Sequence, residues 1–345
     1  MGARAFITDV AGTVLTDRER AFFRESEPWG LIVFKRNINT PDQVRRLTDS
    51  FREAVGRADA PVLVDQEGGR VQRLGPPHWP AYPAGADYGR LYDRDPQEGL
   101  TAARLGARLI ATDLAAVGID VDCWPLADVP VPSADAVIGG RAFGTDPDKV
   151  AAHAGAVAEG LRDGGVLPVV KHIPGHGRAN ADSHHELPVV TADRASLDAT
   201  DFRAFRALAG LPLAMTAHVV FTAIDPVTPA TTSATIVREV IRELIGFDGL
   251  LMTDDISMQA LTGDMRARSR ASIAAGCDVV LHCNGRFDEQ CAVAEAVPAL
   301  AGAAARRAAA ALAWHRPGPE IDVAEARERF AAMMAPVRGD EAVRS

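Results

Sequence analysis

Two short stretches of this chain concentrate side chains that can transfer protons: residues 171–177, with the sequence KHIPGHG, and residues 182–184, with the sequence DSH. A proline and two glycines so close together fit neither a helix nor a strand, so the pattern predicts a loop. The loop follows an apolar run at residues 166–170, which is typical of a buried strand. Imidazoles and carboxylates on a loop beyond a buried strand indicate the catalytic face of an α/β enzyme.

Polar and charged residues also stand after other apolar runs. They are the mixed acidic and basic segment 65–73, then Asp128, Arg141, His218, Asp254 and Asp255. Because Asp254 and Asp255 face opposite sides of an extended chain, we expect one to point into the site and the other to support a loop. A parallel barrel would gather all these strand-end residues at one mouth.

Eight apolar runs with polar or glycine-rich ends are interpreted as strands: residues 5–10, 30–34, 61–64, 119–124, 166–170, 211–216, 249–253 and 278–281. Helical patterns separate most of them, at residues 41–54, 100–117, 149–161, 235–245 and 265–275. Continuous apolar strands alternating with amphipathic helices predict an α/β fold, and eight of them predict a single (β/α)8 TIM-type barrel. The alternative is an open doubly wound sheet, but no GxGxxG motif follows an early strand to support it.

The remaining segments are assigned around this barrel. Residues 68–100, rich in Pro, Gly and Tyr, are expected to form a long loop at the site face. We expect the barrel to occupy about residues 5–290 and a C-terminal helical extension about 291–340, within one catalytic domain spanning 1–345. Thr40 is a suitable cap for one helix, and Ser233 or Thr235 for another.

The composition bears on several classes of protein. A net charge of −9 leaves no global basic footprint for nucleic acid. No stretch reaches 18 uninterrupted apolar residues and the N-terminus lacks a signal-peptide pattern, so we expect no membrane partner and a cytoplasmic location. We also expect a monomer. None of the four cysteines forms a CxxC pair, which argues against a structural zinc site or a redox motif.

Several candidate residues also have a purely structural interpretation. Asp255 alone is equally well explained as a helix N-cap, and His218 as a hydrogen-bonded histidine at the rim. For Glu67 and Arg70 we favour a structural ion pair over direct ligand contact. A metal site is a further hypothesis, raised by His172, His176, His184 and His185. We disfavour it because metal-dependent barrel hydrolases often carry an HxH motif after the first strand, and this chain has none there.

Taken together, the motifs resemble those of glycoside hydrolase family 3, and within it the NagZ-type β-N-acetylglucosaminidases (β-hexosaminidases). The matching segments are residues 65–73 (DQEGGRVQR), 140–144 (GRAFG), 171–177 with 182–184, 216–219 (TAHV) and 253–258 (TDDISM). The resemblance covers roughly residues 5–290, and its most specific parts are the loop motif and TDDISM. One departure is Thr253, where the family often has serine; the hydroxyl is kept.

The resemblance implies a retaining glycosidase without cofactor or metal. By position in the motifs, Asp254 would be the nucleophile, and His184 paired with Asp182 would be the acid/base. The sugar would be surrounded by Asp65, Arg73, Arg141, Lys171, His172, His176 and His218. An imidazole in place of the usual second carboxylate is chemically reasonable, since its ordinary pKa of about 6.5 lets it give and recover a proton near neutrality. The loop glycines would let the loop close over substrate.

The implied substrate is a terminal β-linked N-acetylglucosamine. In the bacterial cytoplasm it would be released from N-acetylglucosaminyl-1,6-anhydro-N-acetylmuramic acid, with or without peptide, during peptidoglycan recycling. Three alternatives stay open: a β-glucosidase or broader glycosidase, a glycoside phosphorylase, and a non-catalytic sugar-binding protein. The presence of Asp254, Asp182 and His184 argues against the last, because a binding protein needs no nucleophile.

Overall fold

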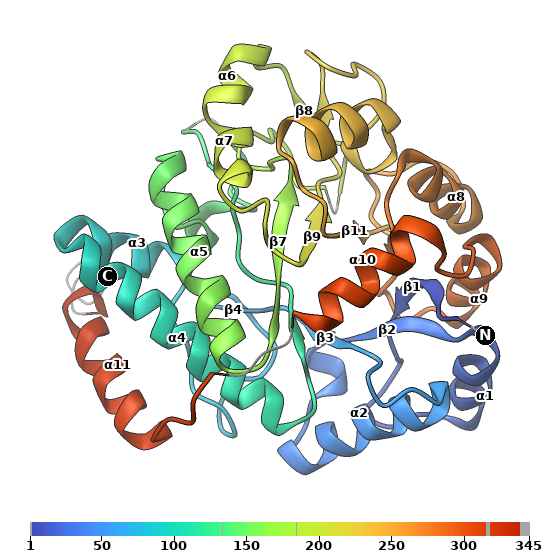
Figure 1. Cartoon of the computed structure of the whole chain (residues 1–345), viewed down its shortest axis with the longest axis horizontal. Coiled ribbons are helices and arrows are strands. Elements are labelled where there is room, and N and C mark those ends of the chain that lie inside the picture. The colour runs from blue at the N-terminus through green and yellow to red at the C-terminus, as the bar shows by residue number, and fades with distance from the viewer. Residues whose placement is uncertain (1, 133, 184, 315–317, 339–345) are drawn as a thin grey trace.

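The computed structural model describes residues 2–132, 134–183, 185–314 and 318–338. Eight parallel strands close into a barrel with helices around it (Figure 1). Around the barrel the order is β1 (Arg4–Thr8), β2 (Pro28–Val33), β3 (Val62–Val64), β6 (Val121–Asp122), β7 (Leu167–Ile173), β9 (Leu213–Thr216), β11 (Leu250–Asp255) and β12 (Val279–Leu281). Each of the eight apolar runs forms one barrel strand, so the predicted TIM-type fold is confirmed.

Alternate residues of each strand divide between the barrel interior and the helix layer. Ile32 pairs with Leu63, and Leu63 with Val121, and all three belong to the cluster that fills the barrel. Leu31 and Val33, on either side of Ile32, belong to the cluster between strands and helices. Both faces of a strand are therefore buried, which is why the strands are continuous apolar runs rather than alternating patterns.

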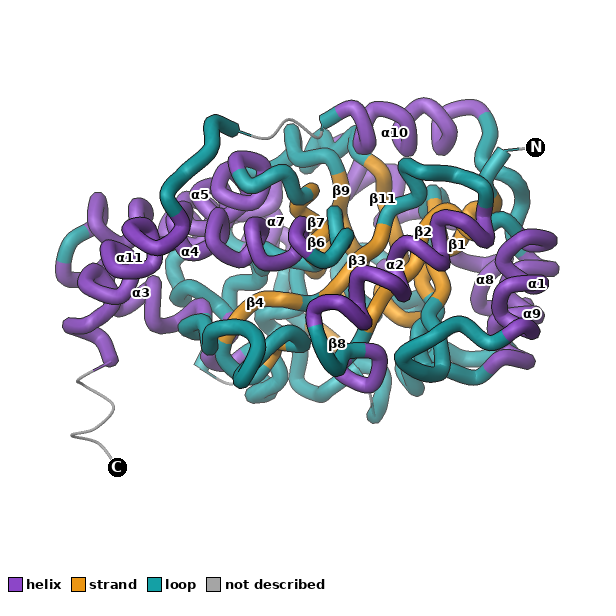
Figure 2. The backbone as a smooth tube through the Cα atoms, turned by 90° about the horizontal axis from the view of Figure 1, so that it is seen from below, coloured by secondary structure: helices purple, strands orange, loops and turns teal. Residues whose placement is uncertain are grey.

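Helices cover the outside of the barrel (Figure 2). They are α1 (Asp17–Ser26), α2 (Pro41–Val55), α3 (Gly85–Arg94), α4 (Pro96–Ala116), α5 (Pro147–Asp163), α6 (Arg194–Ala199), α7 (Asp201–Arg206), the π-type helix η4 (Ile236–Leu244), α8 (Met265–Ala275) and α9 (Phe287–Ala296). Thr40 caps α2 as expected, accepting the N–H of Gln43 at 3.3 Å. At the start of η4, the side-chain hydroxyl of Ser233 accepts the backbone N–H of Ile236.

Helix α10 (Gly302–Ala313) closes the end of the barrel at which the strands begin. Two of its alanines belong to the cluster inside the barrel. Its Arg307 also binds Asp248 at 2.8 Å and Asp278 at 3.1 Å, and these carboxylates lie just before β11 and β12. Helix α11 (Val323–Arg338) instead packs on α3 and α4 (Figure 1). Chemistry must therefore be sought at the opposite end, where the strands finish.

Residues 68–100 do not form one long loop, which corrects the expectation from sequence. A short hairpin, β4 (Gln66–Gly68) with β5 (Val71–Gln72), opens the segment, and α3 and the start of α4 complete it. Between them, the side-chain amides of Gln66 and Gln72 bind backbone groups of Leu74, Pro80 and Tyr82. These bonds replace the backbone pairing that a proline-rich chain cannot provide.

The boundary of the predicted loop at residues 171–177 is also different. Strand β7 continues to Ile173, so Lys171 and His172 stand in the strand and the loop begins at Pro174. Lys171 and Ile173 still pair with β9, at Met215 and Thr216. The pairing holds the two polar side chains on a rigid element.

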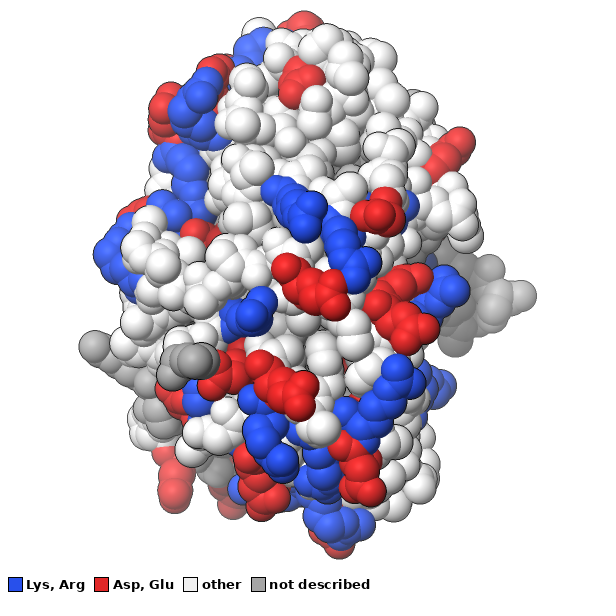
Figure 3. Space-filling view, turned by 90° about the vertical axis from the view of Figure 1, so that its right-hand side faces the viewer, with Lys and Arg blue, Asp and Glu red and all other residues white. Residues whose placement is uncertain are grey.

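The exterior carries mixed charge. On the face shown in Figure 3, basic and acidic side chains are interspersed, as expected for solvated helix faces. Across the described ranges, every helix is too short or too polar to span a bilayer.

Candidate active site

A cavity of about 370 Å³ opens at the carboxyl ends of the barrel strands. Six of the barrel strands contribute to its wall or are followed directly by a residue that does. Seven of the ten site residues predicted from sequence line it: Asp65, Arg73, Arg141, Lys171, His172, Asp182 and Asp254. The remaining lining is mostly apolar and includes Phe34, Met215 and Leu281. Barrel closure has thus brought together residues that are up to 189 positions apart, from 65 to 254.

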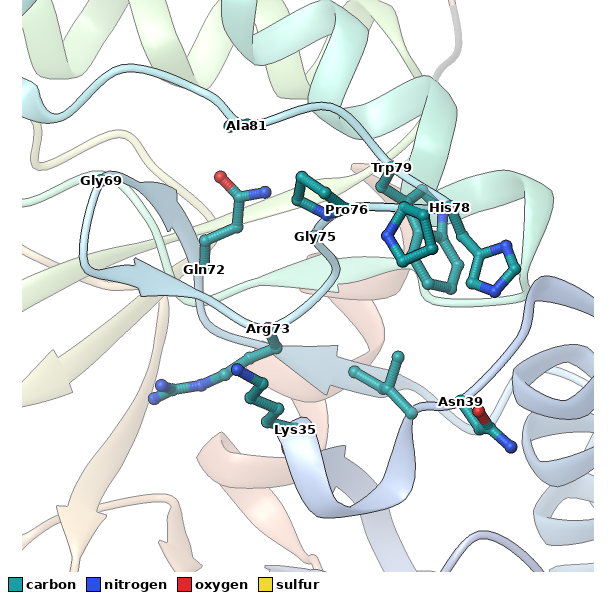
Figure 4. Close-up of a pocket in the computed structure, with 12 residues that line it drawn as sticks. Lys35, Asn39, Gly69, Gln72, Arg73, Gly75, Pro76, His78, Trp79 and Ala81 are labelled. Carbon is teal, nitrogen blue, oxygen red and sulfur yellow. The ribbon is translucent and has the colours of Figure 1, made fainter.

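A second cavity of about 300 Å³ lies beside the β4–β5 hairpin and includes Arg73 in its wall (Figure 4). Among the residues that the structure describes, its lining includes Lys35, His78 and Trp79 but no carboxylate. Without a carboxylate, this second cavity cannot supply the nucleophile that the sequence motifs predict. The cavity that contains Asp254 and Asp182 is therefore the candidate active site.

A buried ion network forms one wall of this site. The Lys171 ammonium lies 2.8 Å from Asp65 and 2.7 Å from Glu67, and its side chain is only 2% exposed. Arg73 binds the second oxygen of Asp65 at 3.0 Å. Arg141 binds both oxygens of Glu67, at 2.9 and 2.7 Å. Each charge is paired, and that pairing allows charged side chains to be buried here.

The network fixes the charge state of its carboxylates. Burial alone would raise the pKa of Asp65, but the charges of Lys171 and Arg73 outweigh it and hold that pKa well below the ordinary value. Burial would likewise raise the pKa of Glu67, but the charges of the nearby Lys171 and Arg141 outweigh burial and lower it. Both side chains are therefore anionic at neutral pH, and the cavity offers fixed acceptors as well as fixed donors.

The expected ion pair between Glu67 and Arg70 is absent from the described structure, which corrects the sequence interpretation. Glu67 binds Arg141 and Lys171 instead. The guanidinium of Arg70 donates a hydrogen bond to the backbone carbonyl of Val137. The tight turn at Gly68 and Gly69, both with positive φ, separates the two side chains after the strand.

Asp254 is the last but one residue of β11 and is 9% exposed. One of its oxygens accepts the backbone N–H of Asp255 at 2.8 Å. Burial would raise its pKa, but His172, His218, the N–H of Asp255 and Lys171 together outweigh burial and lower it. Asp254 is thus a buried, ionised carboxylate at the cavity wall, which is what a nucleophile at an anomeric carbon requires.

Asp255 supports a loop, as the alternation of an extended chain predicts. Its carboxylate accepts the N–H and the hydroxyl of Ser257, at 3.0 and 2.6 Å, and the N–H of Cys283 at 3.3 Å. It is not a helix N-cap, because Asp264 caps the next helix, α8.

His218 and His176 are buried but do not line the cavity. The Nε2 of His218 lies 3.0 Å from the carbonyl oxygen of Asp255, and its Nδ1 lies 2.7 Å from the hydroxyl of Thr231. Burial lowers the pKa of His218, so the ring is neutral and donates from Nε2 to that carbonyl. The structure thus places His218 behind the end of β11, where it binds the backbone next to Asp254.

His176 stands at the start of the loop. Its backbone N–H donates to Asp128 at 2.7 Å, and its ring packs 5.6 Å from that of His172, centroid to centroid. Burial and the nearby His172 lower the pKa of its imidazole to about 4, so the ring is neutral. Its position behind His172 explains why it does not reach the cavity wall.

The loop between β7 and Asp182 is anchored to the rest of the protein. Arg178 binds Asp201 at 2.6 Å, and the carbonyl of Gly177 accepts the N–H of Val131 at 3.1 Å. Asp182, further along, is half-buried and reaches the cavity. The third catalytic residue predicted from sequence, His184, lies outside the described residues.

Gly177 is required by packing, and this leads to a prediction about stability. A Cβ at this position would lie 2.2 Å from the carbonyl oxygen of Val129, closer than real contacts allow. Gly177→Ala must therefore shift the loop, and we expect a loss of about 1–3 kcal/mol in the free energy of unfolding, measured by denaturant titration. Gly210→Ala is the matched control, because nothing lies within 4 Å of a Cβ there. Equal stability of the two variants would contradict the close approach at Val129.

Comparison with known proteins decides the family. A model described as the N-terminal domain of glycosyl hydrolase family 3 matches residues 14–311, which is most of the chain. This chain belongs to glycoside hydrolase family 3. A β-hexosaminidase from Alkalilimnicola ehrlichii is 40% identical over 293 residues, covering 84% of this chain and 81% of the relative. A β-hexosaminidase from Pseudomonas aeruginosa is also 40% identical, over 295 residues, covering 84% and 85%.

Solved structures agree with the sequence relatives. NagZ from Neisseria gonorrhoeae, crystallised with N-trifluoroacetyl-D-glucosamine, superposes with a TM-score of 0.84 at 32% identity, covering 98% of both chains. A family 3 β-N-acetylglucosaminidase from Paenibacillus sp. gives a TM-score of 0.84 at 27% identity, covering 96% of this chain and 67% of that one. The closed barrel is thus the fold of this family 3 glycosidase.

Two side chains that hold the cavity wall were not among the site residues predicted from sequence. Glu67 binds two of the cavity-lining cations, and Asp128 binds the ring of a third lining residue, His172, at 2.7 Å. Both follow apolar strands, as Asp65 and Asp254 do. The sequence signal therefore exists, but it does not separate residues that face the cavity from those that hold them.

Proposed function

We propose that this glycoside hydrolase is a retaining β-N-acetylhexosaminidase. It releases terminal β-linked N-acetylglucosamine from N-acetylglucosaminyl-1,6-anhydro-N-acetylmuramic acid, with or without peptide, in cytoplasmic peptidoglycan recycling. The observation that carries the proposal is the ionised carboxylate of Asp254 in a cavity also lined by Asp182. The β-hexosaminidases at 40% identity, and the N-trifluoroacetyl-glucosamine complex of the Neisseria protein, support N-acetylglucosamine as the released sugar.

Asp254 performs the first bond-forming step. The N–H of Asp255 holds one carboxylate oxygen, which fixes the orientation of the carboxylate. The carboxylate attacks the anomeric carbon on one face of the sugar, and the glycosidic oxygen departs from the opposite face. A covalent glycosyl-enzyme ester forms, and the aglycone leaves with a proton received from the acid.

His184 and Asp182 handle that proton. His184 donates it to the leaving oxygen, and then accepts a proton from the water that attacks the ester. Asp254 recovers its negative charge, and two inversions give net retention at the anomeric carbon. Asp182, which lines the cavity, holds the imidazole in the required tautomer and orientation.

The ion network recognises the sugar hydroxyls. Asp65 offers acceptor oxygens, while Arg73, Arg141 and Lys171 offer donors, and each is already held by a partner inside the protein. Because the side chains are fixed before the sugar arrives, little ordering is needed on binding. The cavity, at about 370 Å³, lies near the lower end of the usual range for small-ligand sites, as suits one terminal sugar ring.

His184→Ala should reduce hydrolysis of substrates with poor leaving groups far more than hydrolysis of aryl glycosides with good ones. A good leaving group departs with little protonation, so the loss of the acid matters less. We expect losses of about 10²- to 10⁴-fold for alkyl or sugar aglycones, measured as kcat/KM across a leaving-group series. Asp182→Asn should show the same trend more weakly. A uniform loss across the series would limit His184 to shaping the site.

The proposed function is tested by a panel of aryl β-glycosides with and without phosphate. We expect β-N-acetylglucosaminide to be cleaved much faster than β-glucoside, with free sugar as the product; sugar 1-phosphate would instead identify a phosphorylase. The panel is repeated after exhaustive chelation, because the Neisseria NagZ has also been crystallised with a zinc ion. Activity should survive, since the proposed steps need no Lewis acid; loss with EDTA and recovery with zinc would overturn the assignment.

A further inference from the structure

Asp128 lies behind the active site and holds one of its walls. It follows β6, is 0% exposed, and does not line the cavity. Its Oδ2 lies 2.7 Å from Nδ1 of His172, and its Oδ1 accepts the N–H of His172 at 3.2 Å and of His176 at 2.7 Å. One buried carboxylate therefore joins the end of β7 to the start of the loop that carries Asp182.

The charge of Asp128 determines which nitrogen of His172 carries a proton. Burial would raise the pKa of Asp128, but the His172 ring and the hydrogen bonds outweigh it and lower that pKa, so the carboxylate is ionised. An ionised carboxylate can only accept hydrogen bonds. The proton between Oδ2 and Nδ1 must then belong to the imidazole, so a neutral His172 ring is held as its Nδ1–H tautomer.

The second ring nitrogen is the one available to a ligand. His172 lines the cavity together with Asp254, and its Nδ1 is occupied by Asp128. Within the described ranges, no hydrogen bond is found for Nε2, and this atom is not among the buried polar atoms without a partner. In the neutral ring with Nδ1 protonated, Nε2 carries a lone pair and accepts hydrogen bonds.

We propose that Asp128 is a positioning residue that locks His172 in its Nδ1–H form and so presents Nε2 to the cavity as an acceptor for a sugar hydroxyl beside Asp254. The same carboxylate fixes the loop through the backbone N–H of His176. The hydrogen bond from a sugar hydroxyl to Nε2 rests on the proposed function, whereas the Nδ1–H form of His172 does not. Separate experiments can therefore contradict either claim.

Asp128→Asn is the informative substitution, because it nearly preserves the shape of the side chain and reverses one hydrogen bond. The amide oxygen would keep the two backbone N–H groups that Oδ1 now accepts. The amide NH2 would then face Nδ1 and act as a donor, so the proton of His172 must move to Nε2. The cavity would gain a donor where it now has an acceptor.

The direct test is ¹⁵N NMR of histidine-labelled protein, without substrate. Two-bond ¹H–¹⁵N couplings distinguish the tautomers, and the signal of His172 is identified by its absence in His172→Gln. We expect the Nδ1–H form in the wild type and the Nε2–H form in Asp128→Asn. Asp122→Asn is the control, because Asp122 is equally buried but binds the N–H of Gln66. The Nε2–H form in the wild type, or no change in Asp128→Asn, would overturn the proposal.

Kinetics test whether Asp128 acts through His172. We expect Asp128→Asn to lower kcat/KM on an aryl β-N-acetylglucosaminide on the order of 10- to 100-fold, by analogy with outer partners of ligating histidines. In the His172→Gln background the same substitution should cost less than about threefold, because its target is gone. Full additivity of the two losses would make Asp128 a structural residue only. An inactive wild type would refute the proposed function while leaving the NMR result intact.

Discussion

Asp254→Asn is expected to lower kcat on an aryl β-N-acetylglucosaminide by more than about a thousandfold, which is about 4 kcal/mol of barrier. An amide can neither attack the anomeric carbon nor stabilise positive charge there. The fold should survive, because the amide oxygen can still accept the N–H of Asp255 that the carboxylate accepts at 2.8 Å. The measurement is steady-state kinetics, together with a thermal melt to show that the variant is folded.

Asp255→Asn is the matched control for this substitution. Asp255 also reaches the cavity, but its carboxylate is occupied by Ser257 and by the N–H of Cys283. We therefore expect a smaller loss of activity, accompanied by some loss of stability as those bonds weaken. If Asp254→Asn retained activity within tenfold of the wild type, Asp254 could not be the nucleophile.

Lys171→Met is expected to be the most damaging substitution for stability. Methionine fills a similar volume but leaves Asp65 and Glu67 without the ammonium that lies 2.8 and 2.7 Å from them. Removing one partner from a buried ion network costs about 3–5 kcal/mol of unfolding free energy, which denaturant titration would measure. Lys149→Met is the control: its partner Asp93 is 66% exposed, and such pairs contribute about 1 kcal/mol or less.

The stability of Lys171→Met should change with pH in the opposite direction to that of the wild type. In the wild type the pKa values of Asp65 and Glu67 are lowered, so they stabilise the fold at neutral pH and that contribution is lost as the pH falls through the folded values. Without Lys171, burial raises the pKa of at least one of them. The variant should therefore gain stability relative to the wild type as the pH falls from about 8 to about 5. Parallel melting curves across this range would show that the ammonium does not set the charge of these carboxylates.

The barrel was predictable because its determinants are local. A strand buried on both faces must be apolar at nearly every position, and each of the eight apolar runs forms one barrel strand. The ends of these runs also predicted most of the cavity wall, since polar residues after parallel strands meet at one mouth. Residues 68–100 differ from the expectation because the chain after the hairpin is held by the side-chain amides of Gln66 and Gln72, which no periodic pattern reveals.

The apolar runs alone identify the strands and the mouth at which the motif residues gather, but the partners of those residues depend on barrel closure. Glu67 stands three positions from Arg70, yet it binds Arg141 and Lys171, which come from distant segments. His218 and His176 resemble ligand-binding residues in the motifs, yet both are packed behind the cavity wall. The physical reason is that strand formation depends on burial along one segment, whereas ion pairing depends on which side chains barrel closure brings within about 3 Å of one another.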